Sequence, residues 1–109
     1  MKNFGNKVML TGNLGMDPVY RKFENGTSMA RLSIATNEIK RNVNGESNKT
    51  TNWHNLIAWG GTADIIKLML QKGRLVSIEG HLNNKKWKDK DGKTKNRSEI
   101  VIRDFTLLG

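Results

Sequence analysis

Residues 52–73 read NWHNLIAWGGTADIIKLMLQKG and contain the clearest change from strand to helix in the chain. The first part of this segment alternates between two sides, which predicts a strand over residues 52–59. The two glycines that follow break the strand, and Thr62 is a suitable N-cap for the segment after them. Apolar side chains then recur at helical spacing up to Gly73, a typical C-terminal stop, so a helix of about two to three turns follows the strand.

Two strands are expected before this segment and two after it. The five expected strands span residues 7–13, 29–36, 52–59, 75–82 and 98–105. Asn25-Gly26 is a hairpin signal before the second strand, and Pro18 marks a turn or an edge. Residues 40–50 contain a single aliphatic side chain and predict a long, mobile, basic loop. Residues 89–92 read DKDG and predict a turn inside a very basic stretch.

Three strands, a helix and two further strands form the chain order of an OB-fold. We therefore expect an all-β protein, an OB-fold built as a five-stranded Greek-key barrel with one helix between the third and fourth strands. Other small barrels share pieces of this order. Because compact domains usually have about 100–150 residues, we expect residues 1–109 to form a single domain.

The chain is strongly basic, with 19 Lys and Arg against 10 Asp and Glu, which gives a net charge of +9. Such a surplus favours a polyanionic partner, and nucleic acid and an anionic membrane surface both fit the charge. No apolar run approaches the roughly 20 residues that a membrane-spanning helix needs, so no membrane-embedded segment is expected. The absence of Cys is compatible with a reducing compartment.

Few residues could support catalysis or hold a metal ion. Without Cys, a nucleophile would have to be Ser or Thr, and only His54 and His81 could serve as its histidine base. A histidine such as His54, on the strand side opposite Trp53, is more often a packing or interface residue than a base. His81 and Glu79 could form half of a metal site, but no third ligand is evident. We expect no catalytic residue, no metal, no cofactor and no enzymatic activity.

Two of the three tryptophans lie next to basic segments. Residues 85–97 carry seven positive and two negative charges around Trp87. Trp53 follows the basic segment that ends in Lys49. Lys and Arg neutralise phosphates, and an indole stacks on an unpaired base with roughly 1–3 kcal/mol per base, which favours single strands over duplex. The alternative is that Trp53 and Trp59 belong to the barrel core and that the lysine run is a solvated hairpin.

The chain resembles bacterial-type single-stranded DNA-binding proteins (SSB) over nearly its whole length. Six segments carry the resemblance in order and at consistent spacing: residues 6–18 (NKVMLTGNLGMDP), 35–38 (ATNE), 53–54 (WH), 72–73 (KG), 79–82 (EGHL) and 86–89 (KWKD). The resemblance implies an OB-fold that assembles as a homotetramer and wraps single-stranded DNA during replication, recombination and repair. It also implies a cytoplasmic, nucleoid-associated protein.

The resemblance assigns roles to individual residues as well. Three tryptophans fall at stacking positions of the family: Trp53, Trp59 and Trp87. Basic DNA contacts of the family fall on five residues: Lys7, Arg21, Lys72, Lys85 and Lys86. Lys40 and Lys49 are further candidates for phosphate contacts, and His54 falls where the family has a subunit-interface residue.

The chain departs from the family pattern at three internal positions. Where many members have a further stacking Trp at the end of the second strand, this chain has Lys40 after Ile39. We therefore expect a phosphate contact to replace one stacking residue. Asn55 and Asn83 occupy positions that are often basic, so some phosphate contacts are expected to be missing.

The chain ends at Gly109, where the barrel is expected to end. Members of the family usually continue with a flexible linker rich in Gly, Pro and Gln and with an acidic tip that recruits partner proteins. A natural short form, as on some mobile elements or phages, and a trimmed chain both fit this end. Without the tip, we expect DNA binding to survive and the recruitment of replication and repair proteins to be lost.

Three other functions stay open at this point. A primosomal replication protein has the same fold, although the three tryptophans favour SSB. A single-stranded RNA-binding OB domain is a further alternative, because stacking and lysines do not recognise the 2′-hydroxyl group. A small metal-dependent nuclease would need clustered carboxylates, and those of this chain are dispersed.

Overall fold

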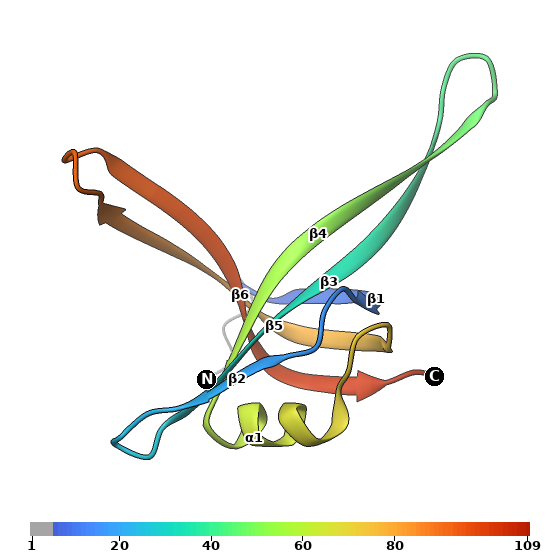
Figure 1. Cartoon of the computed structure of the whole chain (residues 1–109). Helices are drawn as coiled ribbons and strands as arrows, with labels where there is room; N and C mark the ends of the chain where they lie inside the picture. Colours follow the sequence, from blue (N-terminus) through green and yellow to red (C-terminus); the bar gives the residue numbers. More distant parts are fainter. Residues whose placement is uncertain (1–5) are drawn as a thin grey trace.

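The computed structural model describes residues 6–109 as a set of strands with one helix, which lies at one end of the molecule (Figure 1). The elements are β1 Val8–Leu14, β2 Val19–Lys22, β3 Ser28–Arg41, β4 Ser47–Trp59, α1 Gly60–Met69, β5 Leu75–Lys88 and β6 Thr94–Leu107. The five long strands pair in the order β1-β5-β6-β4-β3, and a further pairing of β1 with β3 closes them into a barrel. In chain order, α1 lies between the third and fourth barrel strands, which confirms the expected OB-fold topology.

Two glycines allow barrel strands to approach one another closely. A Cβ atom on Gly12 of β1 would overlap the carbonyl oxygen of Ala35 in β3. A Cβ atom on Gly80 of β5 would overlap the carbonyl oxygen of Val101 in β6, next to a register shift between these strands. Because a strand backbone cannot move aside as a flexible side chain can, these two positions require glycine.

Aliphatic side chains fill the interior of the barrel. The largest fully buried side chains of this core are Ile34, Leu56, Ile66, Val76 and Ile78. They come from β3, β4 and β5 and from α1, which covers one end of the barrel with Ala63 and Ile66. Burial of each large aliphatic side chain contributes roughly 1.5–3 kcal/mol, so the barrel holds most of the stabilising free energy.

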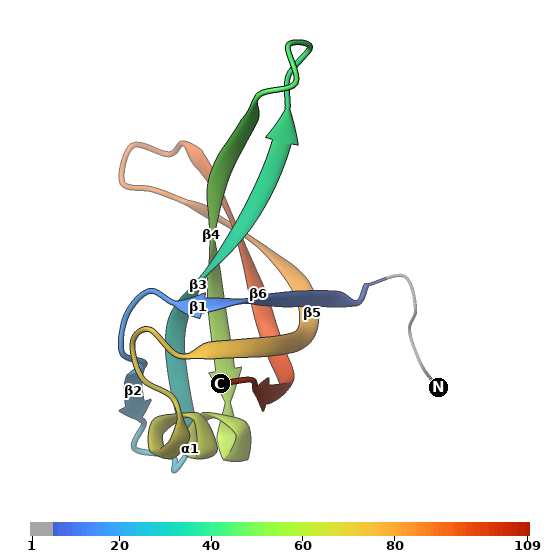
Figure 2. The ribbon, with the colours of Figure 1, turned by 90° about the vertical axis from the view of Figure 1, so that its right-hand side faces the viewer.

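Two long hairpins extend away from the barrel on the side opposite α1 (Figures 1 and 2). We call residues 36–52 of β3 and β4 the first arm, and residues 83–98 of β5 and β6 the second arm. Each arm consists of two paired strands and has no third strand among residues 6–109. Nearly all of their side chains are exposed, so both arms are surfaces and contain no core of their own.

The expected mobile loop over residues 40–50 is wrong, because β3 and β4 continue through most of it. The hairpin turns at residues 42–46, where the Asn42 N–H donates to the Glu46 carbonyl oxygen at 3.0 Å. Both faces of this arm are solvated, so its strands lack the apolar alternation that marks a half-buried strand. For the same reason, the expected strand boundaries at residues 52, 82 and 98 leave out the arm portions of β4, β5 and β6.

Boundaries also differ around the helix and the second strand. α1 begins at Gly60 and no side chain caps it, so the expected Thr62 cap is wrong. The helix ends before Gly73, which lies in the following turn with a φ of +87°. The hairpin signal at Asn25-Gly26 is confirmed, since Gly26 has a φ of +88° in the turn between β3 and the additional short strand β2.

Candidate nucleic-acid interface

Trp53 and Trp59 lie on one face of the β3–β4 hairpin, because an even number of steps separates them along β4. Both rings are accessible, with 62% of Trp53 and 43% of Trp59 exposed. Ile57, between them on the same face, is fully buried. The interpretation of both tryptophans as core residues is therefore excluded, and both indoles face solvent.

Trp59 stacks on an aromatic residue that sequence reasoning does not single out. The ring centres of Phe23 and Trp59 are 6.5 Å apart, and the ring planes are inclined by 25°. The guanidinium carbon of Arg21 lies 5.4 Å from the centre of the Phe23 ring, a cation–π distance. One feature of the sequence could have indicated Phe23: it is two residues from Arg21, so the two side chains share one side of an extended chain.

Trp53 lies against the main chain that follows β1. A Cβ atom on Gly15 would overlap the six-membered ring of Trp53, so glycine at this position leaves room for the indole. The main chain therefore supports one part of the ring, while most of its surface stays open to a ligand.

A pocket of about 210 Å³ lies beside the stretch of β4 that separates the two rings. Its lining includes Met16, Val19, Arg31, Ser33, Asn55 and Arg97. Arg31 from β3 and Arg97 from β6 bring two cations to a cavity with apolar walls. The sequence pattern does not indicate a role for Arg31, because a single arginine in an alternating strand gives no sign of which residues of other strands lie beside it.

On the second arm, one face combines an indole with cations. Trp87 is 47% exposed and lies directly opposite Lys95. Lys85 lies opposite Arg97 two residues closer to the barrel, and alternation places this pair on the Trp87 face. Lys86 belongs to the opposite face of the arm, so the two neighbouring lysines that the sequence nominates together point to different sides.

Two of the nominated lysines are held in ion pairs. Lys7 Nζ lies 2.8 Å from a carboxylate oxygen of Glu79, and Lys85 Nζ lies 3.0 Å from a carboxylate oxygen of Glu99. The other nominated cations have no carboxylate within 4 Å in the described part of the chain: Arg21, Lys40, Lys49, Lys72 and Lys86. The positive charges of Lys7 and Lys85 are therefore already partly neutralised by these carboxylates before a phosphate binds.

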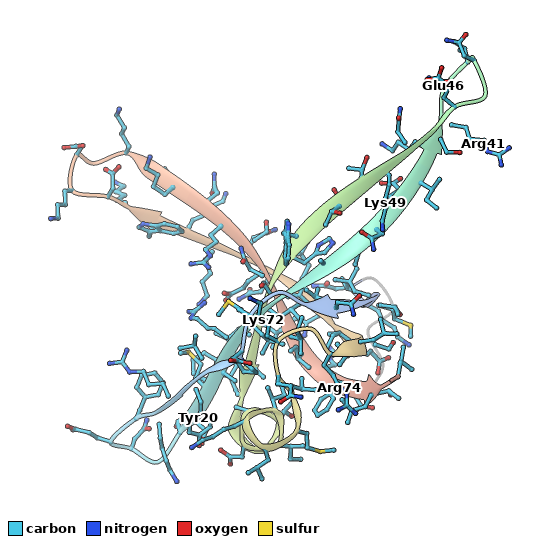
Figure 3. All side chains as sticks on the ribbon, turned by 45° about the vertical axis from the view of Figure 1, so that its right-hand side comes forward. Tyr20, Arg41, Glu46, Lys49, Lys72 and Arg74 are labelled. Atoms are coloured by element: carbon cyan, nitrogen blue, oxygen red, sulfur yellow. The ribbon has the colours of Figure 1, made fainter. Side chains whose placement is uncertain are left out.

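Lys40 and Lys49 lie on opposite faces of the first arm. Lys49 is the direct partner of Ile39, and both share the face of Trp53. Lys40 pairs with Asn48 on the other face. On the side that carries Trp53, the neighbour of Lys40 is Ile39, whose side chain is 71% exposed. Figure 3 shows Lys49 on this arm, away from the barrel.

The helix offers little free positive charge. The Lys67 ammonium lies 4.3 Å from the centre of the Tyr20 ring. The Tyr20 hydroxyl donates to Asp64 Oδ1 at 2.6 Å, and this hydrogen bond lowers the pKa of Asp64. Lys72 follows α1 (Figure 3). Its backbone N–H donates to Asp17 Oδ1, in the connection between β1 and β2, at 2.8 Å. This arrangement is unlike a basic recognition helix.

His54 lies on the face of β4 opposite Trp53 and is partly buried. Its Nε2 atom is 3.0 Å from the Thr36 hydroxyl oxygen of β3, so this hydrogen bond links β4 to β3 at the base of the first arm.

One edge of β1 is open in this structure. β1 pairs with β5 from Val8 to Asn13, whereas it pairs with β3 only at Asn13 and Leu14. From Val8 to Gly12, the edge of β1 that faces away from β5 has no partner strand among residues 6–109. Met9, in this part of β1, is 64% exposed. An open edge of this kind can pair with another chain.

Within the described residues, no group of three or more acidic, His or Cys side chains could hold a metal ion. In the same part of the chain, no helix has the length and apolarity to cross a membrane.

Comparison with known sequences points to one family. Residues 5–108 match the Single-strand binding protein family. Over 105 residues, the chain is 44% identical to "Single-stranded DNA-binding protein 1" of Chlorobaculum tepidum. The aligned region covers 95% of this chain and 65% of that protein. The chain is 36% identical over 105 residues to the protein of the same name from Xylella fastidiosa, which covers 95% of this chain and 77% of that protein.

Solved structures give the same result. The chain is similar to a Plasmodium falciparum SSB in complex with ssDNA, with 31% identity, a TM-score of 0.89 and coverage of 100% of this chain and 99% of that one. It is also similar to a deletion mutant of the single-stranded DNA binding protein from Thermus aquaticus, with 26% identity, a TM-score of 0.85 and coverage of 95% and 50%. The barrel topology and the matched sequence agree, and the chain belongs to the single-strand binding protein family.

Proposed function

We propose that this chain binds single-stranded DNA without sequence specificity and protects it. The observation that carries the proposal is the exposure of all three tryptophans, which is 62% for Trp53, 43% for Trp59 and 47% for Trp87. Exposed indoles stack on unpaired bases, whereas bases in a duplex are already stacked. The names of the two relatives and the ssDNA complex of the Plasmodium protein support the same ligand.

The DNA single strand would contact aromatic and cationic surfaces alternately. Trp59 with Phe23 forms one stacking surface, and Trp53 forms another, with the pocket of Arg31 and Arg97 between them. The second arm adds Trp87. Each stacked base contributes roughly 1–3 kcal/mol, and each neutralised phosphate releases counterions into solution.

The same proposal includes assembly and cellular role. The open edge of β1 supports pairing of two copies, and a homotetramer would join several short binding surfaces into one long site. In it, His54 would lie at a subunit interface. We place the protein in the cytoplasm at the nucleoid, in replication, recombination and repair, as a binding protein without catalytic activity, metal or cofactor.

The test is a titration followed by intrinsic tryptophan fluorescence, with oligo-dT, oligo-rU and a DNA duplex of equal length, at several salt concentrations. We expect strong quenching by oligo-dT, weak quenching by the duplex, and a salt slope of about −0.7 per phosphate neutralised. Equal affinity for all three ligands, lost completely in salt, would mean a merely cationic surface. Tighter binding of oligo-rU than of oligo-dT would assign the protein to RNA.

A further inference from the structure

Glu99 is a buried carboxylate beside the proposed interface. Its side chain is only 2% exposed, at the point where β6 leaves the second arm and joins the barrel. One carboxylate oxygen lies 3.0 Å from Lys85 Nζ, and the other accepts a hydrogen bond from Arg31 Nη1 at 3.4 Å. Glu99 therefore connects β3 of the barrel to β5 of the second arm.

The two cations differ from Glu99 in exposure. The side chains of Arg31 and Lys85 are 38% and 45% exposed, so an anion from solvent can reach them. Lys has three N–H donors and the Arg guanidinium has five, so both groups keep free donors after bonding Glu99. The carboxylate itself is covered and presents almost no surface to an approaching phosphate.

The three residues lie where the stacking surfaces meet. Arg31 lines the pocket of about 210 Å³ beside Trp53 and Trp59. Glu99 lines a second pocket, of about 200 Å³, together with Trp53. Lys85 shares the second-arm face that carries Trp87. A phosphate bound here would lie between bases stacked on the barrel and bases stacked on the second arm.

We propose that Arg31, Glu99 and Lys85 form one phosphate-binding element and that Glu99 is its positioning residue. Lys and Arg are long and flexible, so holding them in place for a ligand costs conformational entropy. A buried carboxylate between them removes that cost before the ligand arrives. The proposal rests on the proposed function, since it concerns binding of single-stranded DNA.

The substitution Glu99→Gln separates positioning from simple charge. It raises the net charge from +9 to 9 + 1 = +10, so attraction by net charge alone predicts tighter binding. Positioning predicts the opposite, a loss of about tenfold in affinity for oligo-dT at fixed moderate salt, because a charged hydrogen bond that organises the site is lost. The matched control is Glu38→Gln, the same change on the exposed first arm, which should bind as well as the unsubstituted protein or slightly better.

A second pair of variants tests the element if Glu99→Gln lowers the melting temperature. Lys85→Gln should lose about tenfold in affinity, and Lys86→Gln on the opposite face about threefold or less. Equal losses for these two lysines, or unchanged or tighter binding by Glu99→Gln, would overturn the proposal. If the unsubstituted protein fails to bind oligo-dT, the proposed function fails first, and the two failures are thereby distinguished.

Discussion

The first and second arms have the same backbone arrangement but differ in the charge of their side chains. Each is a two-stranded hairpin whose turn contains a glycine with positive φ, Gly45 at +79° and Gly92 at +78°. The first arm has three basic and two acidic residues, a net charge of 3 − 2 = +1. The second arm has seven basic and two acidic residues, a net charge of 7 − 2 = +5.

The shape and the charge of these arms are therefore specified by different residues. Turn glycines and strand pairing set the hairpin geometry, whereas exposed side chains are free to vary because no core constrains them. We infer that the two arms contribute differently to affinity. The second arm would contribute a salt-sensitive term, and the first arm, with Trp53 at its base, a stacking term that salt affects little.

The largest expected effect comes from neutralising the Trp87 face of the second arm. In the double variant Lys95→Gln and Arg97→Gln, two cations are removed, so the salt slope should become shallower by at most about 2 × 0.7 = 1.4. Lys95 contributes the smaller share, because its Nζ lies 3.8 Å from a carboxylate oxygen of Asp89. Affinity for oligo-dT should fall by more than about tenfold at low salt and hardly change near 1 M salt.

The matched control is the double variant Lys86→Gln and Lys88→Gln on the other face of the same arm. It removes the same charge from the same hairpin and should lose clearly less affinity at low salt. If both doubles lose the same affinity, the faces of the second arm do not differ, and only its total charge matters.

Replacement of Trp53 by alanine should give the next largest effect. Loss of one stacking surface should reduce affinity by roughly tenfold or more, at low and high salt alike, since stacking contributes roughly 1–3 kcal/mol per base. The salt slope should stay the same, in contrast to the second-arm variant. The melting temperature should change little, because 62% of the residue is exposed. A large drop in melting temperature with unchanged affinity would identify Trp53 as structural.

A gain is expected when Ile39 is replaced by tryptophan. Ile39 is 71% exposed on the Trp53 face of the first arm, so an indole there needs no rearrangement of the core. It should add a stacking surface and increase affinity by about fivefold, near the lower end of the stacking contribution. Lys40→Trp is the matched control on the opposite face, and a larger gain from that variant would contradict the face assignment.

The smallest effect is expected from Gly45→Ala in the turn of the first arm. Alanine at a φ of +79° is strained by about 1 kcal/mol, but the strain is confined to a hairpin without core contacts. Hydrogen exchange of the first-arm amides should speed up, while the melting temperature of the barrel and the affinity change little. The same substitution at Gly92 should loosen the second arm alone. Faster exchange in both arms caused by either variant would show that the arms are coupled.

The barrel was more predictable from sequence than the arms were. Half-buried strands such as residues 29–36 alternate visibly, and the helix after Trp59 shows helical spacing. Residues 40–50 have polar side chains on both faces, so a strand there cannot be distinguished from a loop by its pattern. The same solvation that makes the arms available to a ligand therefore hides them from sequence reasoning.

The types of residue that form the candidate site could be predicted from the sequence, whereas the contacts between them could not. The three tryptophans and the lysine run are visible in the chain, and the tryptophans are exposed in the structure. Phe23 carried a weak local signal that only its stack with Trp59 makes meaningful. That Lys86 and Lys40 point away from the tryptophan faces follows from strand alternation once the true strand bounds are known.

The order of strands and helix, the surplus of positive charge and the grouping of indoles with lysines can all be predicted from the chain, because these properties depend on neighbouring residues in the sequence. The pairing of individual cations and the contacts between faces depend on the folded structure. Arg31 and Glu99 are 68 positions apart in sequence, and closure of the barrel brings them into contact. Such contacts depend on register between distant strands, and that register is set by the packing of the whole core rather than by any local pattern.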